Sequence, residues 1–577
     1  MPRNSVSVKI GGPAGYGIKT TGQIFSKLCL REGLNVFDTI EYPSLIRGGH
    51  NVYYALAEQR KALSHHDGLD FLIALNTESV RIHRDELSKG AGILYDPDKL
   101  DLSKTEVEKS IHLYPVSINK LAIESTGKDI ARNTVALGAM ACILGFSLQS
   151  LNKTIREIFG VKSKDIADMN VKAATAGYDF AKKNFNEKFE HKIHSVKRIN
   201  DKRLLITGNE AIALGAIAAS CSFYAAYPMT PSSSILHYLA ENAEETGMVV
   251  KHAEDEISVI NMAIGSSYAG VRSMCATSGG GFALMNEGFG LAGITETPLV
   301  VAEVQRPGPA TGLPTWHGQG DLQFVLHAAQ GEFPRVIVAP GDPTECFYET
   351  FEAFNIADKF QLPVVVLSDK YLAESTFTIR NFETDKLKIN RGKIASQADL
   401  SKLEGYKRYQ FSKDGVSLRS IPGLKKGRFL ANSDEHDEFG YSSEDAENAA
   451  KQMEKRMQKE KELLKYLPDP VLKGPKNAKI TFVSWGSTKG AILEAMEILK
   501  AQGIETNLLQ MKYLWPFKAD VVKRILKDAK KLVLIEGNYN GQLGKLIRQE
   551  TGVEIKKKIL TYDGRPVSPE RIVAEVR

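Results

Sequence analysis

The sequence predicts an α/β protein made of three α/β domains, and three observations lead to this fold class. Short apolar runs alternate with segments of helical periodicity along most of the chain. Charged stretches without apolar periodicity interrupt this alternation twice, at about 182–202 and 382–475. A chain of 577 residues can also bury several cores. We therefore expect α/β domains at 1–190, 203–381 and 476–577, a linker at 191–202, and an irregular excursion with a helix at 382–475.

The first predicted domain opens with a strand at Val6–Ile10, a glycine-rich turn, GGPAGYG, and a helix that runs to Leu30. Further strands are expected at Asn51–Leu56, Phe71–Leu75 and Gly92–Tyr95, and helices over Asn133–Phe185. The turn invites a dinucleotide-binding interpretation. Its spacing departs from GxGxxG, however, and the nearest acidic residue at a second strand is Asp38, so NAD binding is not favoured.

The second and third domains show the pattern of parallel sheets, in which buried strands are continuous apolar runs separated by helices. In the second domain the expected strands are Ser222–Ala226, Arg272–Ala276, Leu299–Glu303, Arg335–Val338 and Pro363–Leu367. In the third they are Ile480–Ser484, Glu505–Gln510 and Lys531–Glu536. The excursion between these domains is expected to end in an exposed helix at Ala446–Leu464, which is rich in Glu, Lys, Met and Gln.

Composition excludes several classes of protein. The net charge of +6 is spread over 75 basic and 69 acidic residues without a long basic block, which argues against nucleic-acid binding. The longest apolar candidate, Val135–Phe146, is too short to span a membrane and predicts a buried helix. No secretory signal is recognisable, so the cytoplasm is expected. The five cysteines form no CxxC pair, which argues against a zinc site or an iron–sulfur cluster held by this chain.

The strongest functional signal is YPMTPSS, residues 227–233, which directly follows an apolar strand and precedes a helix. Ligands of open α/β sheets bind at the carboxyl ends of strands, and a helix N-terminus attracts anions such as carboxylates. On local chemistry alone, Thr230 and Ser232 could equally be helix caps. A second acidic signal, DEHDE at 434–438, looks superficially like a metal site, but neighbouring residues of an extended segment point to opposite faces. A solvated charged loop is the better interpretation.

YPMTPSS closely resembles the signature of the 2-oxoacid:ferredoxin oxidoreductases. HAEDEIS (252–258), TSGGGFALMNEG (277–288) and QRPGPATGLPT (305–315) are similar to α-chain motifs of that family, in the same order. EGNYNGQL (536–543) and YDGRPVSPE (562–570) match its tail, and the GGPAGYG domain resembles its γ unit. The chain thus resembles a γ–α fusion of the 2-oxoglutarate synthase type, whose three domains would be a γ-type domain, a thiamine-diphosphate pyrimidine-binding domain and a transketolase C-terminal-like domain.

The resemblance implies roles for particular residues. Glu256 would be the catalytic carboxyl that holds the aminopyrimidine of thiamine diphosphate in its imino form, although Glu254, Asp255 and Glu256 also suit a helix start. Arg306, Thr230 and Thr315 would bind the substrate carboxylate. The cofactor would also contact the residues Tyr227, Pro228, Ser278, Gly279 and Gly280. In the γ-type domain, the GGPAGYG turn would be structural or contact coenzyme A, and Arg47 of YPSLIRGGHN could shape a surface facing the active site.

The chain lacks a GDG sequence followed by NN, the usual magnesium-diphosphate motif of thiamine enzymes. The resemblance therefore implies a β subunit that supplies the diphosphate site, Mg²⁺ and a [4Fe–4S] cluster. The expected reaction is the reversible, coenzyme A-dependent oxidative decarboxylation of a 2-oxoacid, most closely 2-oxoglutarate to succinyl-CoA, with electrons passed to ferredoxin. Pyruvate, branched-chain and aryl 2-oxoacids are alternative substrates. A nucleotide-binding subunit or a non-catalytic adaptor is an alternative of another class.

Overall fold

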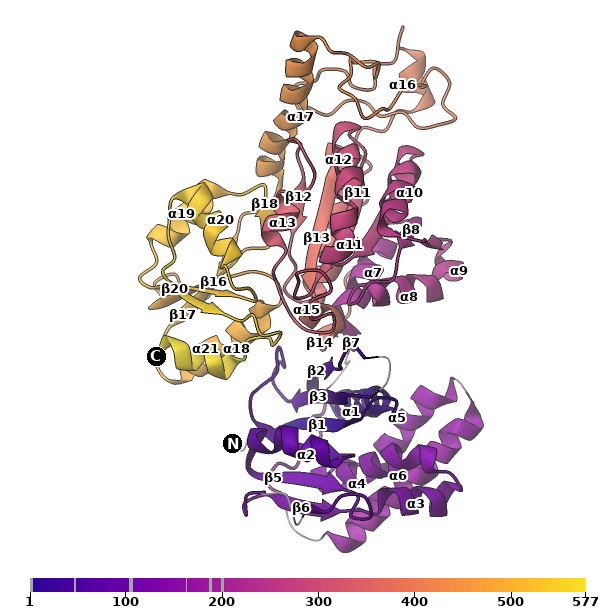
Figure 1. Cartoon of the computed structure of the whole chain (residues 1–577), viewed down its shortest axis with the longest axis vertical. Helices are drawn as coiled ribbons and strands as arrows, with labels where there is room; N and C mark the ends of the chain where they lie inside the picture. Colours follow the sequence, from indigo (N-terminus) through magenta and orange to yellow (C-terminus); the bar gives the residue numbers. More distant parts are fainter. Residues whose placement is uncertain (1–3, 46–47, 103–106, 162, 186–188, 199–201) are drawn as a thin grey trace. The chain divides into compact units, whose positions relative to one another are not determined.

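The computed structural model describes the chain except for residues 1–3, 46–47, 103–106, 162, 186–188 and 199–201 (Figure 1). The described residues form two compact units. The first unit contains Met1–Ile206, Ser375–Asn381 and Ser568–Ala574, and the second contains Thr207–Glu374, Phe382–Val567 and Glu575–Arg577. Arg47, which the sequence placed in a surface-shaping motif, lies outside the described residues.

The first unit is built on an eight-stranded mixed sheet with the strand order β6-β5-β4-β1-β3-β2-β14-β7. Strand β1 pairs in parallel with β4 and antiparallel with β3. The strands are β1 (Ser5–Pro13), β2 (Asn35–Glu41), β3 (His50–Glu58), β4 (Leu69–Ala74), β5 (Leu87–Tyr95), β6 (His112–Pro115), β7 (Arg203–Thr207) and β14 (Thr376–Arg380). Strands β7 and β14 come from the two ends of the predicted second domain, whose exact boundaries stay a prediction.

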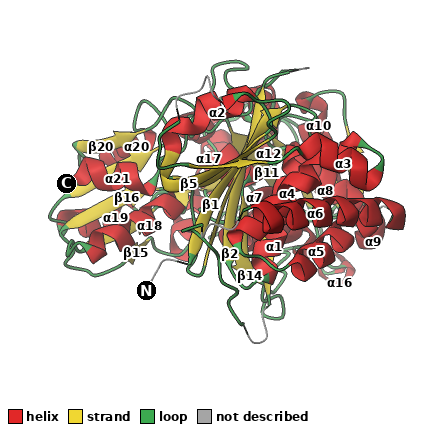
Figure 2. Cartoon of the chain, turned by 90° about the horizontal axis from the view of Figure 1, so that it is seen from below, coloured by secondary structure: helices red, strands yellow, loops and turns green. Residues whose placement is uncertain are grey.

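Most helices of the first unit gather around one core, while Val80 belongs to a second buried cluster. Figure 2 shows α1, α4, α5 and α6 side by side, and Phe25, Met140 and Ala174 from three of them share one buried cluster with Val8 of the sheet. The helices are α1 (Ile18–Arg31), α2 (Thr77–His83), α3 (Ile118–Thr126), α4 (Arg132–Leu144), α5 (Leu148–Gly160) and α6 (Lys164–Asn184). Gly145 ends α4 in the left-handed region, at a φ of 89°, where a residue without Cβ is favoured.

The second unit contains a seven-stranded sheet with the order β18-β12-β13-β11-β10-β8-β9. Every residue of β11 and β13 is buried, because helices cover both faces: α10 and α12 share a core with Cys275 and Val301, and α14 packs on β11 and β13. The strands are β8 (Phe223–Ala226), β9 (Val249–His252), β10 (Ser273–Thr277), β11 (Leu299–Gln305), β12 (Val336–Val338), β13 (Pro363–Asp369) and β18 (Tyr513–Trp515). All pairs are parallel except that of β12 with β18.

A five-stranded sheet with the order β15-β17-β16-β19-β20 completes the second unit. Its strands are β15 (Val471–Lys473), β16 (Ile480–Ser484), β17 (Thr506–Gln510), β19 (Leu532–Glu536) and β20 (Lys557–Leu560). The remaining helices of the chain are α7 (Gly208–Ala218), α8 (Ser233–Glu241), α9 (Ala243–Thr246), α10 (Glu256–Tyr268), α11 (Gly279–Leu284), α12 (Asn286–Ile294), α13 (Leu322–Leu326), α14 (Pro343–Phe360), α15 (Lys370–Glu374), α16 (Gln397–Ser401), α17 (Ala446–Tyr466), α18 (Thr488–Ala501), α19 (Ala519–Lys527), α20 (Gln542–Thr551) and α21 (Pro569–Val576). The predicted α/β class is confirmed.

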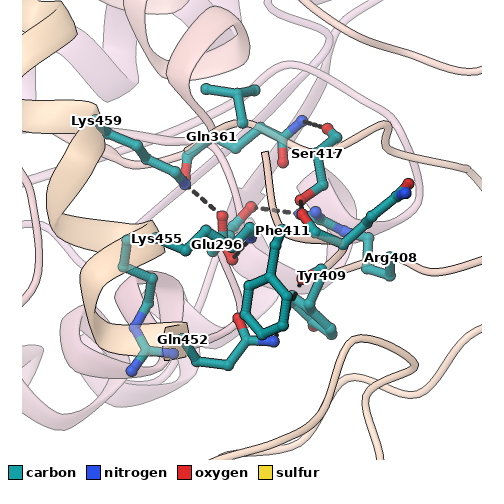
Figure 3. A network of polar contacts seen from close by, with 12 residues as sticks. Glu296, Gln361, Arg408, Tyr409, Phe411, Ser417, Gln452, Lys455 and Lys459 are labelled. Carbon is teal, nitrogen blue, oxygen red and sulfur yellow. Dashed lines mark hydrogen bonds and ion pairs between the residues drawn. The ribbon is translucent and has the colours of Figure 1, made fainter. Parts of the chain in front are cut away.

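The excursion ends in helix α17, as predicted, but this helix is not exposed all round. Its buried residues Gln452, Lys455, Arg456, Lys459 and Leu463 recur at helical spacing and form one face. The two lysines are buried because both bind Glu296: Lys455 Nζ lies 2.5 Å from Oε1 and Lys459 Nζ lies 2.6 Å from Oε2 (Figure 3). Composition alone suggested exposure because long charged side chains are buried only when they are paired.

The DEHDE segment is also not the solvated loop that the sequence suggested. His436 is fully buried and its ring lies 3.9 Å from the ring of Tyr409, centroid to centroid. Glu435 forms an ion pair with Arg456, and Glu438 forms one with Lys407 at 2.6 Å. The carboxylate of Asp437 accepts the backbone N–H of Phe439 at 2.8 Å. These contacts join the DEHDE segment to α17 and to the loop that contains Lys407.

Helix α4 is the segment that the sequence singled out as the best apolar candidate. Eleven of its thirteen residues are buried in the core of the first unit, as predicted. Within the described residues, no helix combines the length and the apolar character needed to cross a bilayer.

Candidate active site

The YPMTPSS loop connects the carboxyl end of β8 to the start of α8 in the second unit. Tyr227 is 40% exposed, and Pro228 is exposed beside it. Ser232 is the N-cap residue, but its hydroxyl donates to the carbonyl oxygen of Met229 at 2.7 Å and caps no backbone N–H of the helix. The structure therefore does not show the helix-capping alternative for this serine. The Ser232 hydroxyl instead forms a hydrogen bond within the YPMTPSS loop.

Arg306 follows directly after β11 and reaches this loop. Its guanidinium donates to the carbonyl oxygen of Thr230 at 2.7 Å, so two residues predicted to bind the substrate carboxylate are in contact. Partial burial lowers the pKa of Arg306 from its ordinary value, although the side chain stays cationic at neutral pH. A half-buried guanidinium with donors left over suits the binding of a carboxylate.

Glu256 is the first residue of α10 and is only 3% exposed. The capping of this helix falls to Asp255, whose carboxylate accepts the N–H of Ser258 at 2.7 Å, while Glu254 is exposed. Oε1 of Glu256 has no hydrogen-bond partner among the described residues. Burial raises the pKa of this carboxyl above its ordinary value. The three acidic residues thus have different surroundings, and only Glu256 is a buried carboxyl with an unused oxygen.

The SGGG turn, Ser278–Gly281, follows β10 and begins α11 (Gly279–Leu284). Glu256 lies against it: a Cβ atom added at Gly281 would come 2.6 Å from Oε1 of Glu256 and would overlap the hydroxyl of Thr277. Gly280 is exposed, with Met229 of the YPMTPSS loop as its nearest side chain. The hydroxyl of Ser278 is buried without a hydrogen-bond partner among the described residues. Gly280 therefore leaves open space, whereas the absence of a side chain at Gly281 admits the Glu256 carboxyl.

The loop after β11 is held in place by the two tail motifs. Gln319 accepts the N–H of Gly537 at 2.9 Å, and its carbonyl oxygen accepts the side-chain amide of Asn538 at 3.1 Å. The Arg565 guanidinium lies 3.4 Å from the ring centroid of Trp316. Glu536 is buried and accepts four donors: the Trp485 indole N–H, the Asn538 amide, and the backbone N–H groups of residues 543 and 544. Thr315 is buried in this loop, and its role stays a prediction.

Two carboxyl groups near Arg306 were not identified from the sequence. Glu303 is a fully buried residue of β11, and Asp321 precedes α13. The available signal was an acidic residue inside an otherwise apolar strand, Leu299–Gln305. A charged side chain in a buried strand is unusual unless it is paired or has a function.

The GGPAGYG turn of the first unit does not form a dinucleotide site of the usual kind. Asp38 lies within β2, is 3% exposed and points into the unit, where burial raises its pKa to about 6. Strand β2 pairs antiparallel with β3 and is not adjacent to β1, whereas the dinucleotide fingerprint needs a parallel neighbouring strand with an accessible acidic residue at its end. A cavity of about 440 Å³ beside the turn is lined by Tyr16, Asn76, Lys99 and Arg132, among others.

Comparison with protein-family models finds three matches along the chain. Residues 7–180 match the pyruvate ferredoxin/flavodoxin oxidoreductase model, and residues 214–455 match the thiamine-diphosphate-binding model of pyruvate flavodoxin/ferredoxin oxidoreductases. Residues 478–572 match core domain II of pyruvate:ferredoxin oxidoreductase. These matches confirm the predicted succession of three domain types.

Curated relatives extend over the whole chain. The 2-oxoacid:ferredoxin oxidoreductase 2 subunit alpha of Aeropyrum pernix is 33% identical, with 99% of this chain and 97% of that protein covered. A 2-oxoglutarate synthase subunit KorA of Archaeoglobus fulgidus is 34% identical over 64% of this chain and 97% of its own length. Among solved structures, a 2-oxoglutarate:ferredoxin oxidoreductase from Magnetococcus marinus with 2-oxoglutarate, coenzyme A and succinyl-CoA bound has a TM-score of 0.92 and 32% identity, covering 100% and 99% of the two chains.

Proposed function

Since this chain belongs to the 2-oxoacid:ferredoxin oxidoreductase family and matches its α subunits over nearly its full length, we propose that it catalyses the conversion of 2-oxoglutarate and coenzyme A to succinyl-CoA and carbon dioxide. Electrons pass to ferredoxin, and the reaction is reversible. A β subunit supplies the diphosphate site, Mg²⁺ and a [4Fe–4S] cluster. The observation that carries the proposal is the buried Glu256 carboxyl, which has an unused oxygen beside the SGGG turn.

The residues present fit the aminopyrimidine end of thiamine diphosphate. A ring nitrogen next to Glu256 would be the missing partner of Oε1, and the raised pKa of this carboxyl suits a group that holds or shares a proton. Gly280 leaves room for a flat ring, and the buried hydroxyl of Ser278 is a hydrogen-bond donor without a partner among the described residues. When bound, thiamine diphosphate supplies the carbanion that attacks the 2-oxoacid carbonyl and takes up the electrons released with carbon dioxide.

Arg306 and Thr230 would then fix the 1-carboxylate of the substrate. The guanidinium is oriented by its bond to the Thr230 carbonyl, and its remaining donors can bind a carboxylate. This contact turns a diffusional encounter into a positioned attack. Tyr227 and Pro228, exposed at the same strand end, would form a wall of the cofactor pocket. The chain itself contributes orientation and a proton-holding carboxyl, while redox chemistry belongs to the cofactor and the partner.

The choice of 2-oxoglutarate is supported by relatives named for that substrate and by the solved structure with 2-oxoglutarate bound. These proteins are about one-third identical to this chain, so a substrate panel is the direct test. The chain would be coexpressed with its candidate β subunit, and reduction of ferredoxin or a viologen dye measured with coenzyme A and each of several 2-oxoacids. We expect the highest kcat/KM with 2-oxoglutarate. Turnover of pyruvate or a branched-chain acid in its place would keep the mechanism and overturn the substrate.

Arg306 gives a second readout in the same assay. Arg306→Lys keeps the charge but loses the planar pair of donors, whereas Arg306→Ala loses both. Because a hydrogen bond to a charged group contributes about 1.5–3 kcal/mol, Arg306→Ala should raise KM for the 2-oxoacid by roughly 10- to 100-fold. Arg306→Lys should lie between the wild type and Arg306→Ala. A KM unchanged in both variants would remove Arg306 from the proposed substrate site.

A further inference from the structure

Asn209 connects helix α7 to the loop of the candidate substrate site. It is the second residue of α7 and is fully buried. Its side-chain amide donates two hydrogen bonds, one to the carbonyl oxygen of Pro231 at 2.8 Å and one to the hydroxyl oxygen of Ser234 at 2.8 Å. Because a carbonyl oxygen can only accept, the contact with Pro231 fixes which end of the amide faces the loop. One side chain from another helix therefore holds both the YPMTPSS loop and the start of α8.

The start of α7 does not need Asn209 as a cap. Thr207 and Glu210 form a capping box there: the Thr207 hydroxyl accepts the N–H of Glu210 at 3.2 Å, and the Glu210 carboxylate accepts the N–H of Thr207 at 2.8 Å. Other residues thus make the side-chain bonds that a helix start requires. The amide of Asn209 is left to act on the neighbouring loop.

Thr230 and Pro231 present two consecutive carbonyl oxygens to two different side chains. The Thr230 oxygen accepts the Arg306 guanidinium at 2.7 Å, and the Pro231 oxygen accepts the Asn209 amide at 2.8 Å. The pyrrolidine ring locks φ of Pro231, and the peptide unit before it is planar, so few bond rotations separate the two carbonyl groups. The direction of one carbonyl group therefore constrains the direction of the other.

We propose that Asn209 is a positioning residue of the substrate site. It fixes the Pro231 carbonyl and thereby holds the Thr230 carbonyl where it orients the Arg306 guanidinium for the substrate carboxylate. This inference rests on the proposed function, because that function assigns Arg306 to the substrate. Asn209 acts through the loop, since both hydrogen bonds of its amide go to Pro231 and Ser234.

The test measures kcat and KM for 2-oxoglutarate with the assembled, cofactor-loaded α–β complex at neutral pH. Asn209→Ala removes both hydrogen bonds and should raise KM by about threefold to tenfold, the size expected for one or two lost hydrogen bonds, with a smaller effect on kcat. Asn209→Asp keeps the size of the side chain, but a carboxylate cannot donate, so KM should rise at least as much. This second variant also serves if the cavity left by alanine prevents folding.

Asn507 supplies a matched control in the five-stranded sheet. It is a buried residue of β17, and its amide also donates to a proline carbonyl oxygen, that of Pro475, at 2.8 Å. Its side-chain oxygen, like that of Asn209, has no hydrogen-bond partner among the described residues. Asn507→Ala should therefore lower the free energy of unfolding by a similar amount, measured by denaturant titration, and leave KM at the wild-type value. An equal rise in KM in both alanine variants would overturn the positioning role, because general destabilisation would explain it.

A double-mutant cycle tests the route through Arg306. If Asn209 acts by holding Thr230 for Arg306, Asn209→Ala should raise KM much less in an Arg306→Ala background than in the wild type, because the group that it positions is absent. Residues that act independently give the same fold-change in both backgrounds. That result would show that Asn209 does not act through Arg306, and the inference would be overturned.

The outcomes separate this inference from the proposed function. If Asn209→Ala and Asn209→Asp leave KM unchanged while Arg306→Ala raises it, the inference is overturned and the proposed function stands. If Arg306→Ala also leaves KM unchanged, the proposed substrate site is wrong, and the inference is wrong with it. If the wild-type complex turns over no 2-oxoacid, both the proposed function and the inference fail.

Discussion

At the scale of single residues, the candidate site depends on what is missing next to Glu256. Gly281 has no side chain, and the space where one would lie is taken by the Glu256 carboxyl and the Thr277 hydroxyl. Gly280, one residue earlier, has its nearest neighbouring atom, Sδ of Met229, 3.9 Å from an added Cβ. Two adjacent glycines in one helical turn therefore serve different purposes: one admits a neighbouring carboxyl, and the other leaves an open surface.

This contrast gives a matched pair of variants. Gly281→Ala should lower the free energy of unfolding by about 1–3 kcal/mol, since the new methyl group must displace packed atoms. Gly280→Ala should be neutral or stabilising by up to about 1 kcal/mol, because alanine restricts the unfolded chain and favours the helix. Denaturant titration of the two variants of the full chain compares them directly. Equal stabilities would mean that Glu256 does not occupy the space at Gly281.

At the scale of elements, the excursion is joined to the second sheet's helices by one buried network (Figure 3). Burial alone would raise the pKa of Glu296, but the charges of Lys455 and Lys459 hold it well below its ordinary value. Arg408 donates to the carbonyl oxygen of Glu296 at 2.8 Å, and Lys459 donates to that of Gln361 at 2.9 Å. Residues far apart in the sequence, on α17 and after α12, are thereby linked by buried polar contacts.

Removing the central charge should loosen the excursion. Glu296→Gln leaves two buried lysines without their counter-charge, and breaking a buried ion pair in this way costs about 3–5 kcal/mol of unfolding free energy. Glu447→Gln is the matched control on α17, the helix that carries both lysines, because the pair of Glu447 with Lys451 is exposed and should contribute little. Limited proteolysis of 382–475 together with thermal unfolding measures both. An unchanged excursion in Glu296→Gln would show that the network does not hold it.

The elements also show which parts of the fold could be predicted from the sequence. Parallel strands such as β11 and β13 are buried on both faces, so they are readable as apolar runs and were predicted. Strand β9, with the sequence VVKH, is short and largely exposed, and β2 carries polar residues, so neither gave a clear signal. The motif residues at strand ends were found through their resemblance to family motifs, and YPMTPSS alone also stood out by its place between a strand and a helix. The full burial of Glu303 depends on tertiary structure, which no local pattern encodes.

At the scale of the whole molecule, the chain is one part of a larger enzyme in the proposed function. Beside Glu256, the second unit exposes the apolar side chains Ile257, Met262 and Leu284, at 53%, 37% and 51% exposure. Exposed apolar residues beside the proposed cofactor site are typical of a surface that a partner covers. The β subunit that supplies the diphosphate half of the cofactor site would lie here.

Assembly should therefore respond to a charge on this surface. Ile257→Glu should weaken binding of the β subunit by at least about tenfold, since an unpaired carboxylate buried at an interface is strongly unfavourable. The variant should leave the fold of the isolated chain unchanged, because Ile257 is already half exposed. Val249→Glu is the control, because it introduces the same charge at an exposed position on β9, outside α10 and α11. Copurification of tagged chain and partner is the readout, and full copurification of Ile257→Glu would place the partner elsewhere.

The most direct test of the central claim is the 2-oxoglutarate- and coenzyme A-dependent reduction of ferredoxin by the assembled complex, in the wild type and in Glu256→Gln. A positioned acid–base group contributes roughly 10²–10⁴-fold to a rate, so Glu256→Gln should lose activity by at least about 100-fold. Glu254→Gln, at the exposed neighbouring position, should keep near wild-type activity. Wild-type turnover by Glu256→Gln, or no turnover of any 2-oxoacid by a cofactor-loaded wild-type complex, would contradict the account.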